Sequence, residues 1–204
     1  MVRFTKLDMK LTQFERAIAA IDKKNSEDFH IDYFQGQEFP KELLYSHRMT
    51  KKLLAFNPNT SEELQIAARA QHICRWKISR NEYPNDKKGY LKWREALKIM
   101  HADIVSDILK DVSYDSEFIN RVTFLIQKKQ IKKDKEAQTM EDVVCLVFLE
   151  YYFEEFATKH DDKKLIGILR KTWLKMSVRG QEAAIKLDFS ARSQSLISQA
   201  IEQD

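Results

Sequence analysis

Residues 64–84, which read LQIAARAQHICRWKISRNEYP, form the stretch that decides how this chain folds. The first part, from Leu64 to Ala70, consists mainly of small and aliphatic side chains. It predicts a helix that packs close to its neighbours and continues to about Trp76. The second part gathers His, Arg, Trp, Glu and Tyr before Pro84 ends the segment. Because these groups directly follow a segment predicted to be buried, we expect them to form one wall of an interior cleft.

Apolar residues recur at helical spacing along most of the chain, and only four Gly and three Pro occur. This scarcity of turn residues argues against a sheet protein with many hairpins. The sequence therefore predicts an all-α protein, an irregular helical bundle with at most one short hairpin. We expect a single domain over residues 1–188 and a C-terminal helical extension over residues 189–204. The longer helices are predicted at residues 10–24, 40–55, 86–111, 116–129 and 140–158.

Two threonines carry signals for helix starts. Thr60 with Glu63 three residues later matches a capping box, which predicts that the central helix begins there. Thr139 is expected to cap the helix over residues 140–158, after a charged loop over residues 130–137. The middle of that helix is apolar nearly all round, so we place it at the centre of the bundle.

The composition is that of an ordinary soluble globular chain, with 43% hydrophobic and 32% charged residues. The net charge of +4 is too balanced to favour a nucleic-acid partner, although it tolerates anionic ligands. The two cysteines, Cys74 and Cys145, stand in apolar contexts without zinc-ligand spacing. The longest apolar run, Val143–Leu149, is far too short to span a bilayer, and the N-terminus lacks a signal-peptide core. We therefore expect a cytoplasmic protein that does not enter the membrane.

The stretch AARAQHICR at residues 67–75 resembles a segment of the HD-domain superfamily of metal-dependent phosphohydrolases. In that superfamily the segment carries an adjacent His-Asp pair, whereas this chain has Gln71-His72 at the corresponding position. The pair is thus an amide and an imidazole, where the superfamily has an imidazole and a carboxylate. Upstream, His47 in the run SHRM falls where the superfamily places its first metal-binding histidine.

Two downstream segments extend this resemblance. The run HADIVSDIL, which begins at His101, is similar to a following helix of the superfamily, and Asp142 matches its closing metal-binding aspartate. An uncharacterised all-helical family within or near the superfamily resembles most of residues 10–188 more closely. The runs that carry this closer resemblance are RAQHICRW, GYLKWR and QTMEDVVCLVFLEYYFEEF.

The resemblance implies an HD-domain-like fold and a metal site. Its candidate ligands are His47, His72, His101 and Asp142. Imidazoles with one carboxylate suit a divalent transition metal, namely Mn, Fe, Ni or Zn, better than Mg. Such a metal would lower the pKa of a bound water and polarise a phosphoryl oxygen. Each candidate also has a structural interpretation, as a helix-end group, a core histidine or an exposed side chain.

Side chains that follow the Gln-His pair could hold a phosphate group. Arg75, Arg80 and Arg94 are candidates, because a guanidinium can bind phosphate through two parallel hydrogen bonds. Trp93 could stack on a nucleotide base, although an aromatic side chain at helical spacing more commonly belongs to the core. Glu82 could act as a general base beside the metal.

Two functions stay open on the sequence. The first is a metal-dependent phosphohydrolase acting on a nucleotide or another small phosphoester, which the candidate ligands in the superfamily's order favour. The second is a non-catalytic HD-like domain that binds a nucleotide or a protein partner, which Gln71 favours. We expect a small anionic or phosphorylated ligand, and the sequence does not indicate the oligomeric state.

Overall fold

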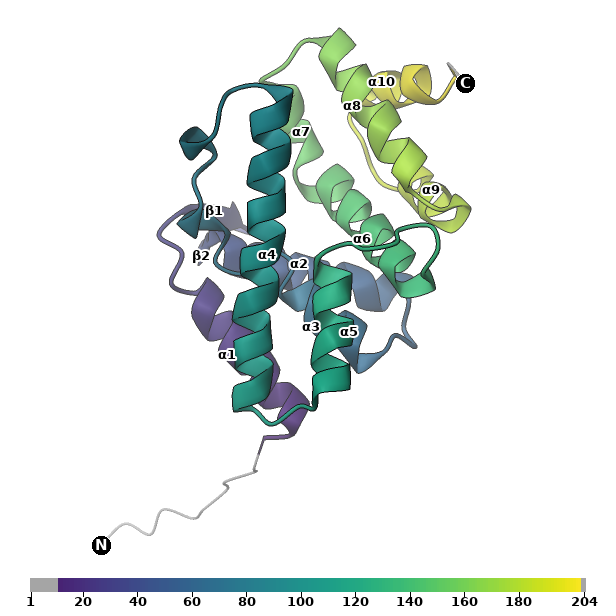
Figure 1. Cartoon of the computed structure of the whole chain (residues 1–204). Coiled ribbons are helices and arrows are strands. Elements are labelled where there is room, and N and C mark those ends of the chain that lie inside the picture. Colours follow the sequence, from purple (N-terminus) through teal and green to yellow (C-terminus); the bar gives the residue numbers. More distant parts are fainter. Residues whose placement is uncertain (1–10, 203–204) are drawn as a thin grey trace, which may run out of the picture.

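The computed structural model describes residues 11–202, and helices dominate it (Figure 1). The prediction of an all-α fold is therefore confirmed. Residues 1–10 and 203–204, at the outer ends of the predicted domain and extension, lie outside the described residues. In chain order the helices are α1 (Gln13–Asn25), α2 (Lys41–Phe56), α3 (Glu62–Arg69), α4 (Lys87–Asp111), α5 (Ser116–Ile126), α6 (Lys135–Tyr151), α7 (Phe153–Ala157), α8 (Asp162–Lys175), α9 (Val178–Ile185) and α10 (Ala191–Ile201).

The described residues hold one two-stranded sheet, a short hairpin between α1 and α2. Strand β1 (Ile31–Phe34) pairs antiparallel with strand β2 (Gln37–Pro40). The connecting residues Gln35 and Gly36 both have positive φ, 51° and 77°, which fits a two-residue turn whose twist matches the paired strands. Arg48 of α2 ties the hairpin to the bundle, because its Nη1 lies 3.1 Å from the carboxylate of the β1 aspartate.

Helix α6 lies between two hydrophobic cores, which explains its apolar sequence. Met140, Val143 and Val147 belong to a core built by α1 to α6. Leu146 and Leu149 belong to a second core, built with α7 to α10. Figure 1 shows α8, α9 and α10 together at one end of the molecule, away from α1. The central position predicted for this helix agrees with the structure. No helix of the described part is long and apolar enough to cross a membrane.

Both predicted threonine caps are wrong, because a better-placed side chain lies nearby in each case. Ser61, and not Thr60, is the N-cap residue of α3, and its Oγ accepts a hydrogen bond from the Leu64 N–H at 3.1 Å. Asp134, in the segment predicted as a loop, begins α6, and its carboxylate accepts two backbone N–H groups of the first turn. The hydroxyl of Thr139 instead donates to a carbonyl one turn back, inside the helix.

The helix predicted to continue to Trp76 ends earlier, at Arg69, and the chain then follows an irregular path. Cys74 takes a left-handed conformation with φ 54°, and its N–H donates to a side-chain oxygen at the end of α1 at 3.2 Å. Two short 3-10 turns follow, Arg75–Lys77 and Arg80–Glu82. Because the helix ends early, the polar side chains of this segment lie beside residues of α2 and α4.

Candidate functional site

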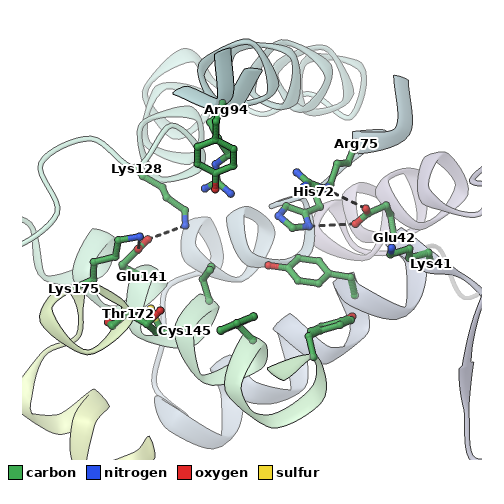
Figure 2. Close-up of a pocket in the computed structure, with 15 residues that line it drawn as sticks. Lys41, Glu42, His72, Arg75, Arg94, Lys128, Glu141, Cys145, Thr172 and Lys175 are labelled. Atoms are coloured by element: carbon green, nitrogen blue, oxygen red, sulfur yellow. Dashed lines mark hydrogen bonds and ion pairs between the residues drawn. The ribbon is translucent and has the colours of Figure 1, made fainter. Parts of the chain in front are cut away.

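A cavity of about 350 Å³ lies against α6, between the two cores (Figure 2). Its walls come from α2, the turns after α3, α4, the α5–α6 connection, α6 and α8. Cavities of this size commonly hold small molecules. The lining residues are Lys41, Glu42, Tyr45, His72, Arg75, Tyr90, Arg94, Lys128, Glu141, Val144, Cys145, Phe148, Tyr152, Thr172 and Lys175.

One end of the cavity, which we call the Glu42 end, consists of Glu42, His72 and Arg75. The Nδ1 atom of His72 lies 3.2 Å from Glu42 Oε2, and the Nε atom of Arg75 lies 3.7 Å from Glu42 Oε1. The ring of Tyr45 stacks on the His72 ring, with 3.9 Å between the centroids. In Figure 2 the second ring nitrogen of His72 points away from Glu42 and into the cavity. The imidazole is therefore fixed in place with one nitrogen open to a ligand.

The opposite end, which we call the Glu141 end, consists of Glu141, Lys128 and Lys175. The Nζ atom of Lys128 lies 2.7 Å from Glu141 Oε2, and both side chains are almost fully buried. The Nζ atom of Lys175, on α8, lies 3.8 Å from Glu141 Oε1. Burial alone would raise the pKa of Glu141, but the attraction of Lys128 outweighs it and lowers that pKa. This end therefore keeps an ionised carboxylate.

Arg94 of α4 lies between the two ends (Figure 2), and its guanidinium forms no ion pair or hydrogen bond with any described residue. Burial lowers the pKa of the neighbouring Lys128, and the positive charge of Arg94 adds to this shift. With both glutamates ionised, the five Lys and Arg side chains that line the cavity leave a surplus of three positive charges. Such a cavity attracts anions.

At the Glu42 end, burial disfavours the charged forms of the carboxyl and of the imidazole. Burial raises the pKa of Glu42 to about 7, although Arg75 opposes this shift. Burial also lowers the pKa of His72 well below its usual value, with Arg75 adding to the effect. The pKa of His101, behind the cavity, falls to about 3 for the same reasons, with a further contribution from Arg94. Both imidazoles are therefore uncharged at neutral pH.

The structure brings His72 and His101 together, with 6.1 Å between their ring centroids. His101 is 2% exposed, and its Nε2 has no hydrogen-bond partner among the described residues. Gln71 lies beside it, and its side-chain oxygen also lacks a partner there. Both line a small void of about 10 Å³, which has room for about one water molecule.

His47 and Asp142, the other two predicted metal ligands, lie elsewhere. The exposed His47 places its Nε2 3.7 Å from a carboxylate oxygen of Asp22. Asp142 holds Ser177, the N-cap residue of α9, by accepting the Ser177 N–H at 2.7 Å and the Ser177 hydroxyl at 2.5 Å. A Cβ on Gly180 would come within 2.7 Å of the Asp142 carboxyl, so α9 packs tightly on that group.

The side chains at hand therefore do not fit the expected metal site. Two of the four predicted ligands are engaged outside the cavity. Within the described part of the chain, no group of three or more His, Cys, Asp or Glu side chains is placed to hold a metal ion. The surplus positive charge of the cavity would also repel a divalent cation.

Three further predicted site residues have local structural partners outside the cavity. Arg80 donates to two backbone carbonyls at the end of its own turn, at 2.9 and 2.8 Å. Glu82 accepts the Ser79 N–H at 2.8 Å in a capping box. Trp93 is 8% exposed, and its Nε1 donates to the Ile78 carbonyl at 3.0 Å. None of the three lines the cavity.

Of the residues predicted to bind phosphate, Arg75 and Arg94 line the cavity. Sequence reasoning missed Glu42, Glu141 and Lys175, which reach it from α2, α6 and α8. One signal was available for Glu141, because it stands next to the aspartate that the resemblance selected. Adjacent helical residues point in different directions, so a shift of one position decides which carboxylate enters the cavity.

The fold and the cavity together define an all-helical protein with a basic, partly apolar cavity between two cores. A family model described as "Domain of unknown function (DUF4202)" matches residues 15–197, and the chain belongs to that family. Searches of curated proteins and of solved structures each found no match to this chain.

Proposed function

We propose that this protein binds a small phosphorylated ligand in the cavity between its two cores. The observation that carries this proposal is the Arg94 guanidinium, which faces the cavity without a carboxylate partner among the described residues. A guanidinium prefers a planar, doubly hydrogen-bonded anion, and phosphate meets that preference. Lys128 and Arg75 add positive charge beside it.

The apolar part of the lining supports a ligand with an organic body. Val144 and Phe148 of α6 line the cavity, together with the aromatic side chains of Tyr45 and Tyr152. A cavity of about 350 Å³ suits a sugar phosphate or a nucleoside monophosphate better than a much larger ligand. The phosphate would lie near Arg94, and the organic part would cover the apolar wall.

Kinship with the HD-domain phosphohydrolases stays a prediction of the sequence. The adjacency of His72 and His101 supports it, since the resemblance implies that these two histidines lie together. The positions of His47 and Asp142 do not support the metal-dependent reaction that the resemblance implies. The contacts therefore favour the ligand-binding alternative over a metal-dependent hydrolase.

Thermal unfolding in the presence of inorganic phosphate tests this proposal. A ligand that binds only the folded protein stabilises it by about 2.7 kcal/mol at a concentration 100 times its dissociation constant. We expect phosphate, but not chloride at equal ionic strength, to raise the melting temperature of the wild type. Arg94→Ala should remove this protection, and it should not lower the melting temperature without phosphate, because Arg94 forms no ion pair with a described residue.

Arg80→Ala is the matched control, because it removes a nearby arginine that binds its own turn and does not line the cavity. This variant should keep the full phosphate protection. Equal protection in the wild type and in Arg94→Ala, or no protection in the wild type at millimolar phosphate, would contradict the proposed function.

A further inference from the structure

We propose that His72, held by Glu42, is a metal-independent general base that hydrolyses a phosphate monoester bound at Arg94. This inference rests on the proposed function, because it requires a phosphate group in the cavity. It assigns a role to an arrangement in the cavity that binding alone does not need, a buried carboxylate beside a partly buried imidazole.

The geometry of the pair matches that of a carboxylate-oriented base. The Nδ1 atom of His72 lies 3.2 Å from Glu42 Oε2. Above the Glu42 pKa of about 7, the ionised carboxylate can accept the Nδ1–H of a neutral imidazole, whose free electron pair then lies on Nε2. Figure 2 shows the second ring nitrogen of His72 pointing into the cavity, toward the side where Arg94 and Lys128 lie. Stacking on Tyr45 prevents the ring from tilting away. The basic nitrogen therefore faces the place where the phosphate would be bound.

Glu42 is fixed as firmly as the imidazole that it orients. Its side chain is 8% exposed, and its second carboxylate oxygen lies 3.7 Å from Arg75 Nε. A carboxylate in this position holds the imidazole in one tautomer and stabilises the imidazolium that forms during proton transfer. Glu42 is thus a positioning residue, and His72 is the group that would touch the reacting water.

A bound substrate would also raise the basicity of His72. In the unliganded cavity, burial and then the nearby Arg75 charge disfavour a protonated His72. A bound phosphate dianion brings negative charge beside Arg94 and Lys128, which offsets the positive field at His72. His72 would therefore become a stronger base when the substrate is present.

The chemical step can be written in full for an aryl phosphate. His72 Nε2 takes one proton from a water molecule, and the water oxygen attacks phosphorus and forms the new P–O bond. The bond between phosphorus and the aryl oxygen breaks, and its electron pair leaves with that oxygen as a phenolate. Arg94 and Lys128 neutralise the charge on the phosphoryl oxygens in the transition state. Release of the proton from His72 to solvent leaves hydrogen phosphate, the phenolate and one proton.

The test uses para-nitrophenyl phosphate with protein purified and assayed in EDTA. We expect the wild type to release nitrophenolate without added metal. His72→Ala should lower kcat by at least about 100-fold, the lower range for loss of a general base. Added imidazole should restore part of the rate to this variant, which a purely structural role of His72 would not produce. Glu42→Gln should lower kcat about tenfold or more and change KM less than about twofold.

Phosphate protection against thermal unfolding, measured on the same samples, separates the two proposals. Protection of the wild type without a nitrophenolate rate above that of His72→Ala would overturn the general base and leave ligand binding intact. Absence of both protection and hydrolysis would overturn ligand binding itself, and the general base with it. A rate that disappears in EDTA would also overturn the metal-independent mechanism.

A measurement on the unaltered protein keeps the inference testable if a variant does not fold. Nitrogen NMR of the wild type with labelled histidine should show His72 with its proton on Nδ1 and none on Nε2. A neutral His72 with its proton on Nε2 would overturn the inference, because that nitrogen could not then accept a proton from water.

Discussion

Glu42 and Glu141 stand at opposite ends of one cavity, and they are 6% and 5% exposed. Burial acts on both in the same direction, yet the pKa of Glu42 is raised to about 7 and the pKa of Glu141 is lowered. The difference lies in the partners. Glu141 has the Lys128 ammonium at 2.7 Å, whereas the nearest partner of Glu42 is an imidazole at 3.2 Å that stays neutral. The hydrogen-bonded ammonium therefore outweighs the effect of burial on the glutamate pKa, whereas a neutral imidazole does not.

The two ends of the cavity therefore have different roles. The Glu141 end is a closed ion pair that holds α6 against the α5–α6 connection. The Glu42 end can gain or lose a proton near neutral pH and faces the ligand.

Removing the ammonium of the Glu141 end should have the largest effect. Lys128→Met would leave Glu141 buried, with the more exposed Lys175 as its remaining ion-pair partner. We expect a loss of about 3 kcal/mol in the free energy of unfolding, measured by urea denaturation at pH 7. Lys129→Met, at an exposed neighbouring position, should change it by less than about 0.5 kcal/mol. A loss below about 1 kcal/mol for Lys128→Met would show that the pair is not a structural element.

The two glutamates should give opposite pH dependences of stability. The folded-state pKa of Glu42 lies above its ordinary value of 4.5, at about 7. Its contribution is therefore fully present below pH 4.5 and is lost as the pH rises toward 7, by about 3 kcal/mol in all. The folded-state pKa of Glu141 is lowered, so its contribution is present above pH 4.5 and is lost as the pH falls below that value.

Denaturation of Glu42→Gln and of Glu141→Gln from pH 3.5 to 8 would measure both contributions. The pKa values of His72 and His101 are lowered in the folded protein, so their contribution to the free energy of unfolding falls as the pH drops below about 6.5. In the wild type this pH dependence is opposite in sign to that of Glu42. The difference between each variant and the wild type is therefore the informative quantity. Equal slopes for Glu42→Gln and the wild type between pH 4.5 and 7 would contradict a raised pKa at Glu42.

Asp142 is the sequence neighbour of Glu141, but its carboxylate contacts Ser177 at the start of α9. Asp142→Ala should cost about 2 kcal/mol, because it removes the acceptor of the Ser177 N–H and hydroxyl at the start of α9. It should leave the transition-metal content of protein purified without chelator equal to that of the wild type. Metal that is present in the wild type and lost in this variant would restore Asp142 as a ligand and contradict the structural role.

Glu82 provides the smallest effect, as an exposed carboxylate outside the cavity. Glu82→Ala removes one side of the capping box with Ser79 and should cost about 0.5 kcal/mol. A change in phosphate protection would place Glu82 in the site after all.

The sequence predicted a helix correctly where a long periodic pattern of apolar residues fits no other secondary structure. The helix expected over residues 86–111 is observed as Lys87–Asp111, because one apolar face persists over its whole length. The starts of α3 and α6 were missed because several residues near each start could serve as caps. Ser61 and Asp134 prevail there, since their side chains also contact other segments. Such contacts cannot be read from local spacing.

Only those residues of the candidate site that lie close together in the sequence could be predicted. His72, Arg75 and Arg94 lie within a short span of sequence and do line the cavity. Glu42 and Lys175 come from distant helices, and their positions depend on how the two cores meet across α6. A single sequence with a resemblance to a known family indicates which residue types to expect, but the packing decides which of them face the cavity.

The position of a bound phosphate analogue would show whether the cavity binds phosphate at Arg94. Crystals soaked in tungstate would reveal the anion by its anomalous scattering. We predict a peak within hydrogen-bonding distance of the Arg94 guanidinium, between the Glu42 end and the Glu141 end, which is absent in crystals of Arg94→Ala. A peak confined to exposed lysines such as Lys132, with none in the cavity, would contradict the account.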